Sequence, residues 1–182
     1  MNESEGKSSV KNVLFYIAMA LSLPIIAACG GGGGSQAPTV KTTATLTINL
    51  AGTLPAEGAI AGAAFIVTLP ANVTPAMTNG AVGSGVVALS GTFTGGTLTT
   101  PISTYTAATV NALGTLSVTL ANSAPAGVTQ VGEVAKITLQ LANGATPSAA
   151  NFGVSTVSSG VIDVDYRTID GMSVSVANVT LQ

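Results

Sequence analysis

The stretch GTLSVTLANSAPAGVTQVGEVAKITLQL, residues Gly114 to Leu141, decides the fold. Its two ends, Gly114–Leu120 and Glu133–Leu141, alternate apolar and polar side chains, which is the period-2 pattern of a strand with one buried face. Residues 121–132 contain Pro125 and Gly127 and predict a loop. In the second strand the pattern predicts that the buried residues are Ala135, Ile137, Leu139 and Leu141, and that the outward ones are Lys136, Thr138 and Gln140.

The same alternation recurs on both sides of this stretch. Upstream it predicts strands at Thr43–Leu50 and Ala59–Leu69, and short strands within residues 71–100, among them 86–89 and 97–99. Downstream it predicts strands at 151–156, 161–167 and 172–181, and a phase change near Ala177-Asn178 indicates a β-bulge in the last of these. Many short strands between turn signals, with no convincing helix, predict an all-β sandwich of about nine strands.

Parts of this pattern resemble the cohesin-like domain, a jelly-roll relative of the cellulose-binding β-sandwiches. The matching segments are AIAGAAFIVTLPANV (Ala59–Val73), the Gly114–Leu141 stretch with its GEVAKIT (Gly132–Thr138), and NFGVS (Asn151–Ser155). The resemblance covers most of residues 43–182. It implies a jelly-roll fold and a protein partner, either dockerin-like or another surface protein. No position matches the family's partner-contacting residues well enough to be assigned.

The N-terminal region resembles a bacterial lipoprotein signal. A charged start, Met1–Lys11, precedes the apolar run Val13–Ala28, and these are the parts of a secretory signal. Ile26-Ala27-Ala28-Cys29 resembles the lipobox, and Cys29 is the only cysteine of the chain. The resemblance implies cleavage before Cys29 and a lipid on its thiol. The predicted organisation is a signal peptide over residues 1–28, a lipidated cysteine and glycine-rich linker over 29–40, and a domain over 41–182.

The predicted location is the outer membrane. Gly30 follows the cysteine where an aspartate would, in many enteric bacteria, mean retention at the inner membrane. The domain would then face the periplasm or the cell exterior. An uncleaved membrane anchor is the alternative, although the apolar run is shorter than the roughly 20 residues that a spanning helix needs.

The composition limits the chemistry. The chain has no histidine, and its five Lys and Arg against seven Asp and Glu give a net charge of −2. His-dependent triads are therefore excluded, no cofactor or metal site is predicted, and nucleic acid is not an expected partner. Asp163 and Asp165 would share a strand face, as an acid pair or, with Asp170, as a calcium site. A solvated face with Arg167 nearby is the favoured interpretation.

Two tyrosines of the predicted domain bear on carbohydrate recognition, because tryptophan is absent. Tyr166 has the phase of Ile162 and Val164, which predicts a core position. Tyr105 is the better candidate for exposure and for ligand contact. The sequence as a whole predicts a lipid-anchored, non-catalytic module for protein binding, adhesion or surface assembly. A polysaccharide-binding module is the alternative, and an enzyme is not expected.

Overall fold

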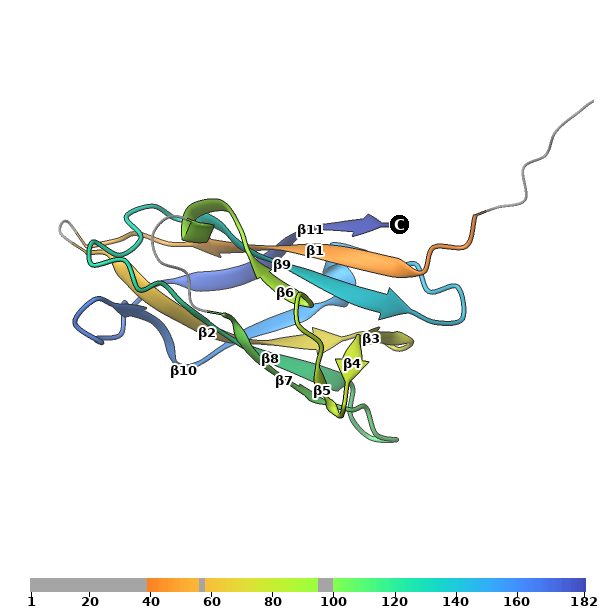
Figure 1. Cartoon of the computed structure of the whole chain (residues 1–182). Coiled ribbons are helices and arrows are strands. Elements are labelled where there is room, and N and C mark those ends of the chain that lie inside the picture. The colour runs from red at the N-terminus through yellow and green to blue at the C-terminus, as the bar shows by residue number, and fades with distance from the viewer. Residues whose placement is uncertain (1–38, 56–57, 95–99) are drawn as a thin grey trace, which may run out of the picture. The chain divides into compact units, whose positions relative to one another are not determined.

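Antiparallel pairing of alternating strands builds a two-layered β-sandwich (Figure 1). The structure, a computed structural model, describes residues 39–55, 58–94 and 100–182. They belong to one compact unit, Thr39–Gln182, which begins close to the predicted domain start at Lys41. The predicted all-β sandwich is confirmed. The strand predicted at 97–99 lies outside the described residues.

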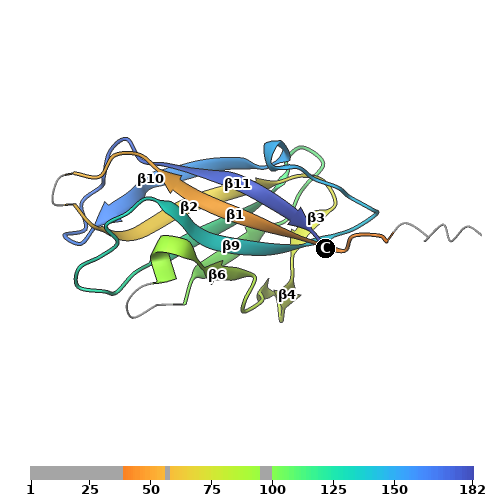
Figure 2. The ribbon, with the colours of Figure 1, turned by 90° about the horizontal axis from the view of Figure 1, so that it is seen from above.

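The first sheet has the strand order β11-β1-β9-β3, and β6 also pairs with β9. Its strands are β1 (Thr43–Ala51), β3 (Val73–Pro75), β6 (Val87–Leu89), β9 (Gly132–Leu141) and β11 (Ser173–Leu181). Figure 2 looks onto this sheet, with β11, β1 and β9 side by side in front of strands of the other layer. The 3-10 turn η1 (Gly91–Thr94) follows β6 and buries Phe93.

The second sheet has the order β10-β2-β8-β7. Its strands are β2 (Ile60–Leu69), β7 (Ile102–Thr106), β8 (Gly114–Ala121) and β10 (Gly153–Asp163), and the 3-10 turn η2 (Ala149–Asn151) precedes β10. Most connections in the described chain cross from one of these two sheets to the other, and β7 and β8 are the only consecutive strands that are neighbours within either of them. Such antiparallel double-sheet crossing is the architecture of jelly-roll folds.

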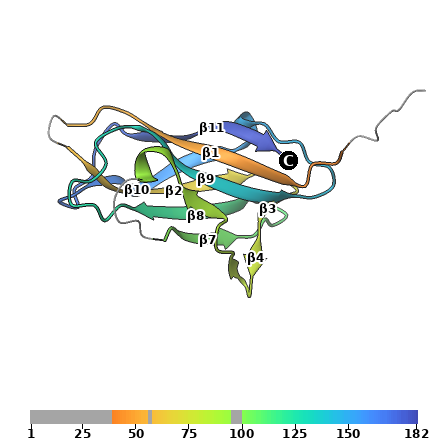
Figure 3. The ribbon, with the colours of Figure 1, turned by 45° about the horizontal axis from the view of Figure 1, so that its top comes forward.

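A small hairpin of β4 (Met77–Thr78) and β5 (Ala81–Val82) stands apart from both sheets, and Figure 3 shows β4 projecting beyond their edge near β7. Its loop is Asn79-Gly80, and both residues have positive φ, 51° and 81°. A two-residue hairpin loop needs this backbone, and Asn-Gly adopts it at little cost. Asn79-Gly80 therefore forms the tight turn that this dipeptide typically forms.

The core fills the space between the sheets, and each sheet contributes the inward half of its alternating residues. Phe65 on β2 and Leu46 on β1 have no exposed surface, as predicted from the alternation. The largest fully buried side chains are Phe65, Phe93, Leu46, Ile48, Leu50, Ile60, Leu69, Leu116, Leu120, Ile137, Leu139 and Val67. Each buried side chain of this size stabilises the fold by roughly 1.5–3 kcal/mol relative to exposure.

Two β-bulges interrupt the alternation in the first sheet. Ala177 is skipped in the pairing of β1 with β11, since Thr47 faces Asn178 and Ile48 faces Val176, which confirms the predicted bulge. Val134 is skipped in the same way in the pairing of β1 with β9. As a result Val134 and Ala135 are both buried, a feature that strict alternation missed. Leu141, predicted to be buried, is only partly buried at the end of β9.

The end of β10 corrects one prediction. Strands predicted at 151–156 and 161–167 are one strand, β10, which ends at Asp163. Residues 164–167 form a turn instead, in which the Tyr166 N–H donates to the Asp163 carbonyl at 3.1 Å. Asp163 stops the strand because its side chain accepts backbone hydrogen bonds two and four residues ahead, a local alternative to the sheet ladder.

Candidate functional site

The outer face of the four-stranded sheet is a regular array of small, neutral side chains. Pairing of β7, β8, β2 and β10 places the outward residues in rows across the sheet. The rows are Thr106, Thr115, Thr68 and Gly153, then Thr104, Ser117, Ile66 and Ser155, then Ile102, Thr119 and Ala64. We call these eleven residues the uncharged face. All of them are at least partly exposed, and Ile102 is 69% exposed.

The outer face of the other sheet differs in charge. Lys136 and Glu133 lie on β9, and they pair with Thr47 and Asn49 of β1 in the sheet. The Lys136 Nζ and Glu133 Oε1 atoms are 3.7 Å apart, a solvent-exposed pair that contributes little to stability. The two sides of the sandwich therefore present chemically different surfaces, one neutral and one carrying charges of both signs.

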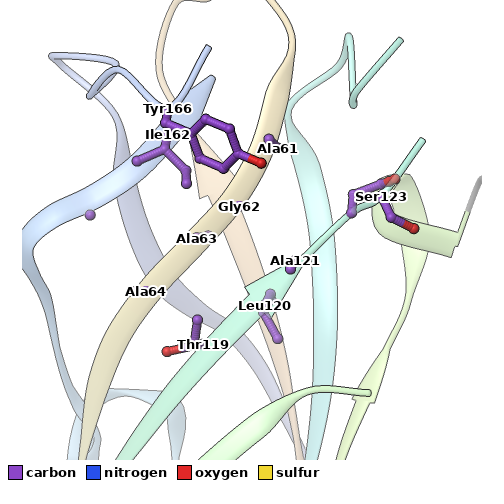
Figure 4. A pocket seen from close by; sticks show the side chains of 12 residues that line it. Ala61, Gly62, Ala63, Ala64, Thr119, Leu120, Ala121, Ser123, Ile162 and Tyr166 are labelled. Atoms are coloured by element: carbon purple, nitrogen blue, oxygen red, sulfur yellow. The ribbon is translucent and has the colours of Figure 1, made fainter. Parts of the chain in front are cut away.

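A groove opens at one end of the four-stranded sheet, between β2, β8 and β10 (Figure 4). It has a volume of about 320 Å³. Its lining consists of Ala61, Gly62, Ala63, Ala64, Thr119, Leu120, Ala121, Asn122, Ser123, Gly160, Ile162 and Tyr166, none of which is charged. The volume is at the lower end of the range for ligand sites, and the walls are mostly apolar with a few polar groups, as is usual for such sites.

The space above β2 is open because the residues that form the floor of the groove there are small. A Cβ atom at Gly62 would lie 3.0 Å from the Leu120 carbonyl oxygen and 3.4 Å from Ile162 Cγ1. Glycine at this position lets β2 and the neighbouring strands approach closely and leaves the space above them open.

Tyr166 forms one wall of the groove. In Figure 4 its ring projects from the turn after β10, beside Ile162 and across β2, with its hydroxyl end toward Ala61. The side chain is 83% exposed. The tyrosine predicted for the core is thus the exposed one, because the strand ends at Asp163 and period-2 alternation no longer applies at residue 166.

Tyr105 has the opposite environment to the predicted one. It pairs with Leu116 in the sheet, so it shares the inward side of β7, and it is partly buried against the core. A Cβ atom at Gly114 would lie 3.0 Å from the Tyr105 hydroxyl, so the ring end packs closely over that glycine. Tyr105 does not line the groove beside Tyr166.

Asp163, the last residue of β10, binds the backbone of the turn that follows it. Asp163 Oδ1 accepts hydrogen bonds from the N–H groups of Asp165, at 2.9 Å, and Arg167, at 2.7 Å. Arg167 Nη1 lies 3.7 Å from Asp165 Oδ2 on the surface. Asp163 and Asp165 therefore do not share a strand face, and the solvated arrangement with Arg167 is the one found. Within residues 39–55, 58–94 and 100–182, no three acidic, Cys or His side chains cluster as metal ligands.

The predicted anchor residue, Cys29, lies outside the described residues, as do the predicted signal peptide and nearly all of the predicted linker. In the part of the chain that the structure describes, no helix has the length and apolar character needed to cross a membrane.

Comparisons with known proteins gave no relative: no family model matches the chain, and no match was found among curated proteins or solved structures. The site must therefore be interpreted from its own geometry.

Sequence reasoning missed Tyr166 as an exposed residue of the site. The signal that could have found it is the Asp163-x-Asp165 spacing, since Asp is a frequent turn former.

Proposed function

We propose that this protein is a lipid-anchored, non-catalytic binding module that acts outside the cytoplasm in adhesion or surface assembly, with a protein partner. The observation that carries the proposal is the contrast between the two outer faces of the sandwich. One face is neutral and carries the exposed Ile102, whereas the other carries Lys136 and Glu133.

The uncharged face suits protein association because none of its side chains carries a charge that would lose its hydration on binding. Charged residues are depleted from the centres of protein interfaces, and desolvating an unpaired charge costs several kcal/mol. Ile102 and Ile66 supply apolar contact, and hydroxyls such as those of Thr104 and Ser117 supply hydrogen-bonding groups between them. With so few charges, association is expected to depend little on salt concentration.

The anchor part of the proposal rests on the resemblance of Ile26–Cys29 to the lipobox. Acylated Cys29 would hold the domain at the outer membrane, facing the periplasm or the cell exterior. The linker up to Val40 is rich in glycine and would act as a flexible coil with a reach of roughly 15–20 Å. Such a tether lets the domain reorient toward a large partner without adding affinity of its own.

The resemblance to cohesin-like domains supports a protein partner, either dockerin-like or another surface protein. A non-catalytic role is supported by Asp163, whose carboxylate is used as a backbone acceptor within its own turn. A glycosidase would need two carboxyl groups free to act on either side of one bond.

A polysaccharide is the second candidate ligand, and a specific observation favours it. Tyr166 is an exposed aromatic ring beside an uncharged groove. Sugars present an apolar face to such rings and hydroxyls to polar neighbours. The groove shares Thr119 and Ala64 with the uncharged face, but it does not include the rows of Thr104 and Thr106.

A matched pair of charge substitutions tests the choice of face. Thr104→Lys on β7 is expected to weaken capture of the partner from the cell envelope at least tenfold, because binding would bury an unpaired ammonium group. Thr138→Lys on β9 places the same charge at an exposed, outward Thr of the other sheet and should leave capture unchanged.

Capture is measured by pull-down with the full chain in detergent, followed by quantification of each co-purified protein. Equal losses with both variants, or loss with Thr138→Lys alone, would contradict the proposed face. Unchanged melting temperatures for the two variants serve as the folding control.

A further inference from the structure

We propose that the groove beside Tyr166 binds a neutral pyranose unit of a polysaccharide, with the tyrosine ring as the stacking surface and Asp163 as the residue that positions it. The inference rests on the proposed non-catalytic binding role and names a ligand class and a site for it. Three independent features of the described residues carry it: the exposure of Tyr166, its backbone conformation and the neutral lining of the groove.

The backbone of Tyr166 is held in a costly conformation. Its φ is 62°, in the left-handed region. The other described non-glycine residues with positive φ are Asn72, Asn79 and Asn143, and asparagine tolerates this region well. A bulky aromatic residue there costs of order 1–3 kcal/mol, and such strain occurs at ligand clamps, where the surrounding structure enforces it.

The enforcing contacts are visible on both sides of Tyr166. The Asp163 carboxylate binds the N–H of Asp165 before it and the N–H of Arg167 after it. The Tyr166 N–H donates to the Asp163 carbonyl at 3.1 Å, and the Asp163 N–H donates to the Arg167 carbonyl at 2.9 Å. The turn is thereby closed, and it presents the ring over the groove rather than into the core. These hydrogen bonds fix the turn before a ligand binds, and this lowers the entropic cost of binding.

The fold does not need an aromatic ring at position 166, because this side chain is exposed. A tyrosine that is 83% exposed gains little from burial, so the fold has no use for an aromatic ring at this strained position. Glycine would fit the same backbone without strain. The ring is therefore best explained by contact with something outside the chain.

The lining of the groove selects the ligand class. None of its described lining residues is charged, so among them an anionic sugar or peptide would gain no partner for its charge. A pyranose ring has one apolar face of C–H groups and a rim of hydroxyls, which match the face of an aromatic ring and a polar neighbour such as Thr119. Grooves for proline-rich peptides are lined by several aromatic rings, whereas Tyr166 is the single aromatic residue of this lining.

The test measures binding and stability together. The full chain in detergent micelles is titrated with uncharged hexasaccharides of glucose, mannose and xylose, and binding is followed by calorimetry. We expect saturable binding of at least one of them. Tyr166→Gly should weaken that binding at least tenfold while leaving the melting temperature unchanged or higher, because the left-handed backbone is relieved. Tyr166→Trp, which keeps a stacking ring, should retain binding.

The positioning role of Asp163 has its own control. Asp163→Asn keeps an oxygen that accepts both N–H groups and should bind like the parent chain. Asp163→Ala removes the acceptor and should weaken binding, and Thr104→Lys, away from the groove, should not. Equal effects of Asp163→Asn and Asp163→Ala would contradict positioning through these hydrogen bonds.

Three results would overturn the inference. They are absence of saturable binding to every hexasaccharide up to about 10 mM, binding that Tyr166→Gly leaves intact, and preference for a proline-rich decapeptide or an oligogalacturonate over the neutral sugars. Cleavage of a bound hexasaccharide would instead overturn the non-catalytic role and leave the groove as a sugar site. Failure of the Thr104→Lys experiment would affect only the proposed protein-binding face.

Discussion

Replacing Phe65 by alanine is expected to lower the free energy of unfolding by about 3–5 kcal/mol. Phe65 has no exposed surface, and it lies on β2 between its partners Val118 of β8 and Thr156 of β10. Truncation removes a large apolar side chain from the layer between the two sheets and leaves a cavity that the paired strands cannot close. The total free energy of unfolding of a domain of this size is about 5–15 kcal/mol, so the loss is a large fraction of it.

Urea unfolding of the full chain in detergent measures this loss as a lower transition midpoint at unchanged slope. Ile102→Ala is the matched control on the same sheet. Ile102 is 69% exposed on the outer side, so its truncation should change the free energy of unfolding by no more than about 0.5 kcal/mol. Similar small effects for the two substitutions would mean that the inward face of β2 is not the core.

Replacing Cys29 by serine is expected to abolish stable membrane attachment. An acyl chain gains about 0.8 kcal/mol for each buried CH₂ group, and two or more chains make attachment stable. A serine hydroxyl does not take the place of the thiol, so the variant should accumulate as an uncut precursor or leave the membrane fraction. Labelling with a fatty-acid probe and fractionation of cells measure both outcomes.

The control moves the thiol instead of deleting it. In Cys29→Ser with Ser35→Cys, the chain again has one cysteine, but the apolar residues Ile26 to Ala28 no longer precede it. No probe should be incorporated into this double variant. Fatty-acid label that persists in the Cys29→Ser single variant would contradict lipidation at this residue.

The regular strands could be predicted from the sequence because one of their faces is buried. Along β8 and β9 the alternation of Leu116, Val118, Ile137 and Leu139 with polar residues matches the buried and exposed sides of the sheet. Period-2 alternation fixes both the element and its inward face in such segments. The bulge at Ala177 was also predictable, because the apolar residues of β11 change phase around it.

The candidate site was harder to predict because it lies where regularity ends. Alternation continued formally through Val164 and Tyr166, but the side chain of Asp163 diverts the backbone into a turn. That diversion depends on hydrogen bonds, which a hydrophobic pattern does not report. For the same reason, the predicted environments of the two tyrosines were the wrong way round. Tyr105 lies on the inward side of β7 because it pairs with Leu116, and only the register of β7 against β8 reveals this pairing.

Site-specific photo-cross-linking in living cells tests the central claim most directly. A photoreactive residue is placed at Thr104 on the uncharged face or, as its matched counterpart, at Thr138 on the opposite sheet. We predict that the chain labelled at position 104 gives a discrete cross-linked protein adduct in the membrane fraction and that the chain labelled at 138 does not. An adduct formed from position 138 and not from 104 would contradict it.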